Sequence, residues 1–324
     1  MKAPVLTFVN NRDTAGKASL IHHLAWMLAS LNKRVIAVDL DPQMHLTSAF
    51  LDDARVESIR AGGIAGSTIH QCVQSLSSDG VLSRPVLQEI TTGLWFLPGD
   101  INLSGFEDEL STAWHRSLTH LDQHALRVLK ALSQILQWAA ADMQPDLLLV
   151  DLGPGLGALN RSALFATDYI AIPLNSDPAS LHGLRQLGAA LKHWKQIWQT
   201  QAGPCPQVGK MQPIGYLYQQ QSLRPNHQTQ VMATWARQIP RVYRESMLGL
   251  PPLEGLTPDN DPECIGLMKN FRSLAQMAKE TRKPMFCLTP ADGAIGCHAS
   301  AAVDAGKHFR QLAREIAARS GVEV

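Results

Sequence analysis

The sequence contains three short runs that are apolar almost from end to end, and they limit the fold more than any other feature. They lie at residues 5–9, 34–39 and 145–151. A strand with apolar residues at successive positions is buried on both faces, which is typical of a parallel sheet covered by helices on both sides. A helical pattern at residues 17–31 connects the first two runs, as a parallel crossover requires. We therefore predict a doubly wound α/β fold with a mostly parallel sheet.

The remaining pattern extends this alternation to the end of the chain. It predicts one domain over residues 1–324, with a helical and irregular insertion at about 52–142 and a loop-rich segment at about 245–283. The insertion begins with a weakly patterned stretch at 52–92 that holds one short helix. Further strands are predicted at 94–98, 169–173, 212–218 and 284–288, and helices at 68–74, 124–140, 158–166, 180–198, 228–238 and 299–319.

Composition excludes several classes of protein. Apolar residues make up 45% of the 324 residues, which is enough for a full core. The five cysteines include no C-x-x-C pair, so we expect a reduced, cytoplasmic protein without a disulfide framework. The twelve histidines show no H-E-x-x-H spacing, so a zinc site is not expected. No apolar run reaches the length of a membrane span, and we expect no membrane partner.

The loop between the first strand and the first helix has the features of a phosphate-binding site. It ends in Gly16-Lys17-Ala18-Ser19 where the helix begins. A helix N-terminus offers unpaired N–H groups and a partial positive charge, and a lysine there can reach phosphate. The fragment matches part of the motif G-x-x-x-x-G-K-[ST]. Taken alone it is weak evidence, because a lysine at a helix start is more often only solvated.

Three elements in order and at specific spacing resemble the ParA/MinD-like family of P-loop ATPases, in its ParA branch. Residues 11–19 resemble the family's deviant Walker A loop, K-G-G-x-G-K-T-[TS]. The run VDLDPQ at 38–43 looks like its V-D-x-D-P-Q element, and LVDLGP at 149–154 resembles its Walker B strand with the following turn. The resemblance covers most of the chain and is weakest at 52–92 and 200–262. It implies a P-loop NTPase fold of the SIMIBI type.

The resemblance assigns roles residue by residue. Lys17 matches the phosphate-binding lysine, Arg12 the second lysine that reaches across an ATP-sandwich dimer, and Asp41 the carboxylate that positions the attacking water. Asp39 and Asp151 match carboxylates that support Mg²⁺ indirectly. The nucleotide, ATP or ADP, would lie on the loop itself, at Asp13, Thr14, Ala15, Gly16, Lys17, Ala18 and Ser19. A homodimer and a protein partner or cargo adaptor are also implied.

The loop departs from the family at positions that hydrolysis needs. Asp13 and Thr14 replace glycines whose backbone must approach the phosphates. The Asp13 carboxylate about 4 Å from a phosphate charge would cost ~1 kcal/mol in water and ~4 at an effective dielectric near 20. Ala18 lacks the hydroxyl that holds Mg²⁺, and Ser19, rotated about 100° along the helix, replaces it poorly. The Arg12 fork also differs in geometry from lysine.

Basic residues gather in one part of the chain. No Asp or Glu occurs between residues 178 and 244, whereas residues 1–177 hold eighteen of them against twelve Lys and Arg. Such a tract predicts a surface for the phosphate backbone of non-specific DNA, as in ParA-like proteins. The alternative is a solvated face, with Trp194 and Trp198 packed in the core. The DNA candidates are Arg224, Arg237, Arg241 and Arg244.

Two functional hypotheses follow. The first is a ParA-like ATP-binding protein that acts as a nucleotide-dependent dimeric switch in DNA partitioning or cargo positioning, with weak or absent ATP hydrolysis. The second is a catalytically dead module that regulates or scaffolds a partner. Asp13 and Ala18 distinguish the two, because they determine whether the loop accepts nucleotide and Mg²⁺.

Overall fold

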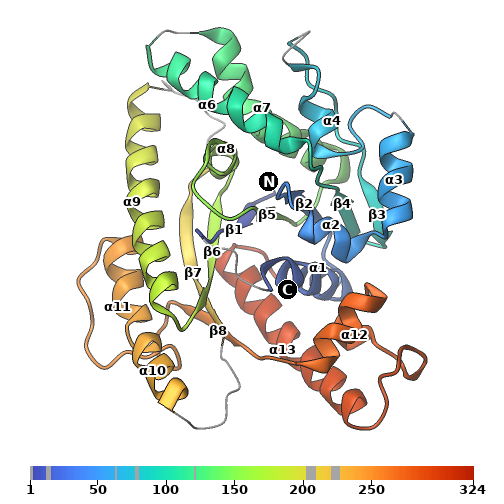
Figure 1. Ribbon diagram of the computed structural model, residues 1–324, viewed down its shortest axis with the longest axis vertical. Helices are drawn as coiled ribbons and strands as arrows, with labels where there is room; N and C mark the ends of the chain where they lie inside the picture. Colours follow the sequence, from blue (N-terminus) through green and yellow to red (C-terminus); the bar gives the residue numbers. More distant parts are fainter. Residues whose placement is uncertain are drawn as a thin grey trace.

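The computed structural model describes residues 3–11, 16–62, 64–76, 80–119, 122–201, 209–219 and 227–324. In this part of the chain one sheet has the strand order β3-β4-β2-β5-β1-β6-β7-β8. Every neighbouring pair is parallel except β3–β4, which is antiparallel. The prediction of a doubly wound, mostly parallel sheet is therefore confirmed (Figure 1).

The elements alternate along the chain as a doubly wound fold requires. The strands are β1 Val5–Phe8, β2 Val35–Leu40, β3 Gln88–Thr91, β4 Leu94–Leu97, β5 Leu147–Leu152, β6 Tyr169–Asn175, β7 Gln212–Gln219 and β8 Cys264–Met268. The α-helices are α1 Lys17–Ser30, α2 His45–Phe50, α3 Asp53–Ala61, α4 Ile69–Val73, α6 Leu103–Thr119, α7 Gln123–Met143, α8 Ala158–Phe165, α9 Pro178–Gln201, α10 His227–Ala236, α11 Ile239–Tyr243, α12 Ser273–Thr281 and α13 Cys297–Arg319. A π-helical turn, η1, spans Arg244–Leu248, and two 3₁₀ turns, η2 and η3, span Met285–Cys287 and Pro290–Asp292.

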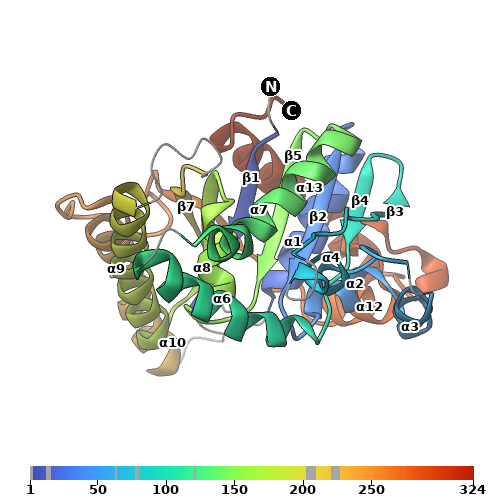
Figure 2. The same ribbon diagram turned by 90° about the horizontal axis from the view of Figure 1, so that it is seen from above.

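Each central strand contributes side chains to two apolar cores, one on each face of the sheet. In β2, Val35 and Ala37 pack in the core shared with α1, α12 and α13, whereas Ile36 and Val38 pack in the core shared with α6, α7, α8 and α9. This division follows from the period of two along a strand. The views in Figures 1 and 2 show α7 and α13 on opposite sides of the sheet.

The last predicted strand was wrong. Residues 284–288 were expected to form it, but they contain the 3₁₀ turn η2, and the final strand is β8, inside the segment expected to be loop-rich. The backbone N–H of Met285 donates to Nε2 of His23 at 3.0 Å instead of to a neighbouring strand. The short apolar run at 284–288 therefore covers α1 and does not extend the sheet.

The stretch at 52–92 is more ordered than its sequence pattern indicated. It was expected to hold one short helix, which α4 confirms, but it also contains α3 and β3. None of the residues of α3 is buried, so this helix lacks the apolar stripe on which a prediction depends. Its N-cap is Asp52, whose side chain accepts from the backbone N–H of Arg55 at 2.7 Å.

Candidate nucleotide-binding site

Candidate residues from the phosphate loop, the D-x-D-P-Q element and the Walker B strand meet at the carboxyl edge of the sheet. Asp39 near the end of β2 and Asp151 near the end of β5 are directly paired across the parallel strands. The ends of parallel strands form the edge at which ligands bind in doubly wound folds. Lys17, at the first position of α1, also reaches this edge.

Lys17 closes the site by joining α1 to β5. Its Nζ lies 3.2 Å from Oδ1 of Asp151 and also donates to the backbone carbonyl of Leu152. Only 8% of Lys17 is exposed, and Asp151 is fully buried. The positive charge of Lys17 therefore favours the ionised form of the buried Asp151.

Asp39 is held differently. Its Oδ1 accepts from the backbone N–H of Asp41 at 3.0 Å, and its Oδ2 accepts from the backbone N–H and the hydroxyl of Thr47 at 2.8 and 2.7 Å. The same Thr47 hydroxyl accepts from the backbone N–H of Gly99 at 2.8 Å. Asp39 therefore anchors the start of α2 and the end of β4 to β2.

Burial makes ionisation of both carboxylates costly. Burial raises the pKa of Asp39 above its ordinary value, and the neighbouring charge of Asp151 raises it further. Burial also raises the pKa of Asp151, but the positive charge of the adjacent Lys17 opposes this rise. A pair of shifted carboxylates beside a lysine is typical of a functional site, although buried structural networks shift pKa values in the same way.

Asp41 faces the loop that follows β5. Its Oδ1 accepts from the backbone N–H of Gln43 at 3.0 Å, and its Oδ2 lies 3.4 Å from Nδ1 of His45. A Cβ added at Gly153 would lie 3.0 Å from Oδ1 of Asp41, so the two segments touch. Asp41 thus lies beside the end of β5, close to the Lys17–Asp151 pair.

The phosphate loop is described only at its end. Arg12, Asp13, Thr14 and Ala15 lie outside the described residues. Gly16 has φ +113°, a backbone conformation that favours glycine, and its carbonyl accepts the backbone N–H of Leu20 at 2.7 Å. It is the residue that turns the chain into α1.

The residues beyond Lys17 do not fit a Mg²⁺ ion held as the resemblance implies. Ala18 has no hydroxyl, and the exposed Ser19 contributes Oγ 3.4 Å from Nδ1 of His23 on the next turn of α1. Both oxygens of Asp39 already accept hydrogen bonds from the chain. Asp151 is already paired with the ammonium group of Lys17.

The loop after β5 is held by residues that the sequence analysis did not assign. The side-chain amide of Asn160 donates to the carbonyls of Gly153 and Gly155 at 2.8 and 2.9 Å. Glu107 of α6 accepts from the backbone N–H groups of Ala158 and Leu159, the latter at 2.8 Å, where α8 begins. A carboxylate at this point also complements the helix dipole. The loop between β5 and α8 is therefore fixed from both ends.

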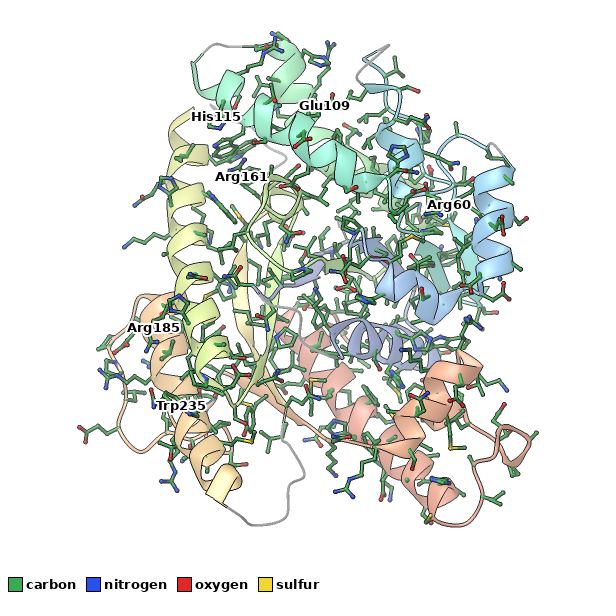
Figure 3. All side chains as sticks on the ribbon, viewed as in Figure 1. Arg60, Glu109, His115, Arg161, Arg185 and Trp235 are labelled. Atoms are coloured by element: carbon green, nitrogen blue, oxygen red, sulfur yellow. The ribbon has the colours of Figure 1, made fainter. Side chains whose placement is uncertain are left out.

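The basic residues that the tract places on α9, just after α10, on α11 and at the start of η1 are here called the basic surface. Arg237 and Arg241 are exposed, and Nε of Arg241 lies 3.1 Å from Oε1 of Glu245. Nε of Arg244 donates to the carbonyl of Pro251 at 3.2 Å. Arg224 lies outside the described residues. Arg185 of α9 and Trp235 of α10 lie on the same side of the molecule (Figure 3).

The buried aromatic residues of the tract do not join this surface. Trp194 and Trp198 are buried, as the alternative interpretation predicted, and Tyr243 is fully buried. Trp198 stacks on Phe165 of α8 with ring centroids 4.1 Å apart. These rings hold α9 on the sheet, so the surface offers charge rather than a row of aromatic faces.

Comparison with known proteins places the chain in a family. The family model described as "AAA domain" matches residues 3–201, which make up more than half of the chain. The sporulation initiation inhibitor protein Soj of Bacillus subtilis is 29% identical over 184 residues, which cover 56% of this chain and 62% of Soj. The chromosome partitioning protein ParA of Myxococcus xanthus is 29% identical over 192 residues, 59% of each chain. The chain thus spans less than two thirds of the length of these relatives.

The fold extends further than this sequence similarity. A solved structure of a Cyanothece McdA variant in complex with ATP matches 100% of this chain and 98% of that one, with a TM-score of 0.60. The two sequences are 12% identical, so this likeness shows the fold alone. None of the helices in the described ranges is long and apolar enough to cross a membrane.

Proposed function

The chain belongs to the ParA family of P-loop ATPases, and on that premise we propose that it binds ATP or ADP and acts as a nucleotide-dependent dimeric switch. The process would be DNA partitioning or the positioning of cargo, because the similar proteins include a chromosome partitioning protein. The observation that carries the proposal is the meeting of Lys17 with the buried end of β5.

Nucleotide binding would exchange the partners of Lys17. In the structure its charge is satisfied by Asp151 and by the carbonyl of Leu152. A polyphosphate on the loop would offer stronger, charge-assisted hydrogen bonds to the same ammonium group. Asp151 would then lose its cation unless another positive group approached, so binding would alter the charge balance at the end of β5. Such an exchange gives the site two states, as a switch requires.

Hydrolysis is the weaker part of the proposed activity. In-line attack on the terminal phosphate needs positioned water and stabilisation of charge, and the family resemblance assigns these roles to Asp41 and Lys17. Ala18 removes the hydroxyl that would hold Mg²⁺, and Asp13 adds negative charge beside the phosphates. We infer that turnover is weak or absent while binding is retained.

The remaining partners are part of the same proposal. Arg12 would reach the nucleotide of a second copy in a sandwich dimer. Arg237, Arg241 and Arg244, with Arg224 earlier in the tract, would contact the phosphate backbone of DNA in a salt-dependent manner. A protein partner or cargo adaptor would complete the system.

The loop also favours a second candidate, a catalytically dead module that scaffolds a partner without using nucleotide. Equilibrium binding of ATP with and without Mg²⁺, followed by phosphate release, separates the candidates. The first requires ATP binding, and Mg²⁺-independent binding without turnover is the expected result. No binding in either condition would leave the scaffolding module. A double variant, Asp13→Gly with Ala18→Thr, should gain turnover if only the loop is impaired.

A further inference from the structure

His45 lies at the edge of the candidate site, next to Asp41. It is the first residue of α2, and its Nδ1 lies 3.4 Å from Oδ2 of Asp41. Its side chain is 52% exposed, whereas that of Asp41 is 4% exposed. The imidazole therefore stands between a buried carboxylate and the solvent side of the site.

The charges around His45 come from several elements. Asp41 contacts it from the β2–α2 turn, and Asp151 of β5 is close enough for the charge of His45 to favour its ionised form. Lys17 of α1 shares Asp151. On the outer side, Arg60 of α3 reaches Sδ of Met44 at 3.2 Å, and Arg282 donates to the carbonyl of Ser48 at 3.3 Å. Among these groups, His45 is the one that places an imidazole ring next to Asp41.

We propose that His45 is a further phosphate-binding residue, held through Nδ1 by Asp41 and presenting Nε2 to the terminal phosphate of the nucleotide. The inference rests on the proposed function, since it needs a nucleotide on the loop. Imidazole in its doubly protonated form donates from both nitrogens, so one ring can join a carboxylate and a phosphate.

The neighbours of His45 indicate which phosphate it would serve. Asp41 touches Gly153 beyond the end of β5, and Lys17 contacts the carbonyl of Leu152 immediately before it. In the proposed function Asp41 positions the attacking water, and hence lies beside the terminal phosphate. His45, which adjoins Asp41, would then distinguish ATP from ADP.

Two conservative substitutions separate phosphate binding from support of Asp41. The amide nitrogen of Asn imitates Nδ1 and could still contact Asp41, but it does not reach as far as Nε2. The amide nitrogen of Gln imitates Nε2 and could still contact phosphate. His45→Ala removes both positions. The experiment measures the Kd of ATP and of ADP for the wild type, His45→Ala, His45→Asn and His45→Gln, with and without Mg²⁺, and checks folding by thermal melting.

The expected result is a loss of about ten-fold in ATP affinity for the Ala and Asn variants, with ADP affinity unchanged and a smaller loss for the Gln variant, which keeps the phosphate donor but not the contact with Asp41. Wild-type affinity in all three variants overturns the inference. The opposite order, with Asn near the wild type and Gln weakened, also overturns it, because His45 would then serve only to hold Asp41. A wild type that binds no ATP refutes the proposed function together with this inference, and so is distinct from a failure of His45 alone.

Discussion

The stability of the fold should fall in mild acid because a neutral histidine joins α1 to the C-terminal segment. In His23, Nδ1–H donates to the carbonyl of Ser19 at 2.6 Å, and Nε2 accepts the backbone N–H of Met285 at 3.0 Å. The ring also stacks on Phe309 of α13 with centroids 4.6 Å apart. A second proton on Nε2 would remove the acceptor for Met285 and place a charge in the core.

The size of the effect follows from the pKa. Burial lowers the pKa of His23 from its ordinary 6.5 to about 4, although its hydrogen bond to Ser19 opposes the shift. The unfolded chain therefore binds the proton first as the pH falls, and stability is lost between about pH 6.5 and pH 4. Between pH 7 and pH 5 the expected loss is about 2 kcal/mol in the free energy of unfolding. Above pH 7 the contribution of His23 is fully present.

Urea denaturation at pH 7 and at pH 5 measures this loss, and a comparison of variants isolates its source. His23→Gln cannot titrate, so its loss between the two pH values should be about 2 kcal/mol smaller than that of the wild type. The control is His193→Gln on the exposed face of α9, which should behave as the wild type does. Comparing differences cancels the opposing contribution of Asp39, whose raised pKa stabilises the fold as the pH falls. Equal losses in the wild type and His23→Gln would refute the reasoning.

Three further predictions concern the site and the basic surface. Thr47→Val removes the hydroxyl that joins Asp39 to Gly99, and should lower the free energy of unfolding, measured in urea, by about 2–4 kcal/mol. Thr47→Ser keeps the hydroxyl and should retain most of this stability. Gly157→Ala places a Cβ 2.4 Å from Oε1 of Glu107, so it should displace this cap of α8 and lower the unfolding free energy by about 1–2 kcal/mol; an unchanged thermal midpoint would argue against that role. If the basic surface binds DNA, Arg237→Ala should reduce the slope of log affinity against log salt by about 1, whatever the DNA sequence, and an unaltered slope would exclude this arginine from the contact.

The sequence predicted those parts of the fold whose burial on both faces shows as a continuous run of apolar residues. The strands β1, β2 and β5 are buried on both faces, so their apolar runs are continuous and easily recognised. Lys17, Asp39 and Asp151 were assigned by the family resemblance, and the adjacent parallel strands β2 and β5 bring the two carboxylates to one edge.

The parts that escaped prediction depend on contacts between distant segments. β8 is a mostly half-buried edge strand whose short apolar run, CIGLM, lies inside the segment expected to be loop-rich, whereas the apolar stretch at 284–288 covers α1. Glu107 caps a helix that begins 51 residues later, and nothing in its own neighbourhood indicates that role. Thr47 and His45 could have been noticed, since they follow the D-x-D-P-Q element within a few residues.

The central claim is that this chain retains a nucleotide site in which Lys17 exchanges its buried partners for phosphate. Isothermal titration of ATP into the wild type and into Lys17→Ala, without Mg²⁺, tests it most directly. The account predicts saturable binding to the wild type at one site per chain, and a loss of at least ten-fold in affinity for Lys17→Ala. Equal affinity of the two proteins, or no binding to the wild type, would contradict it.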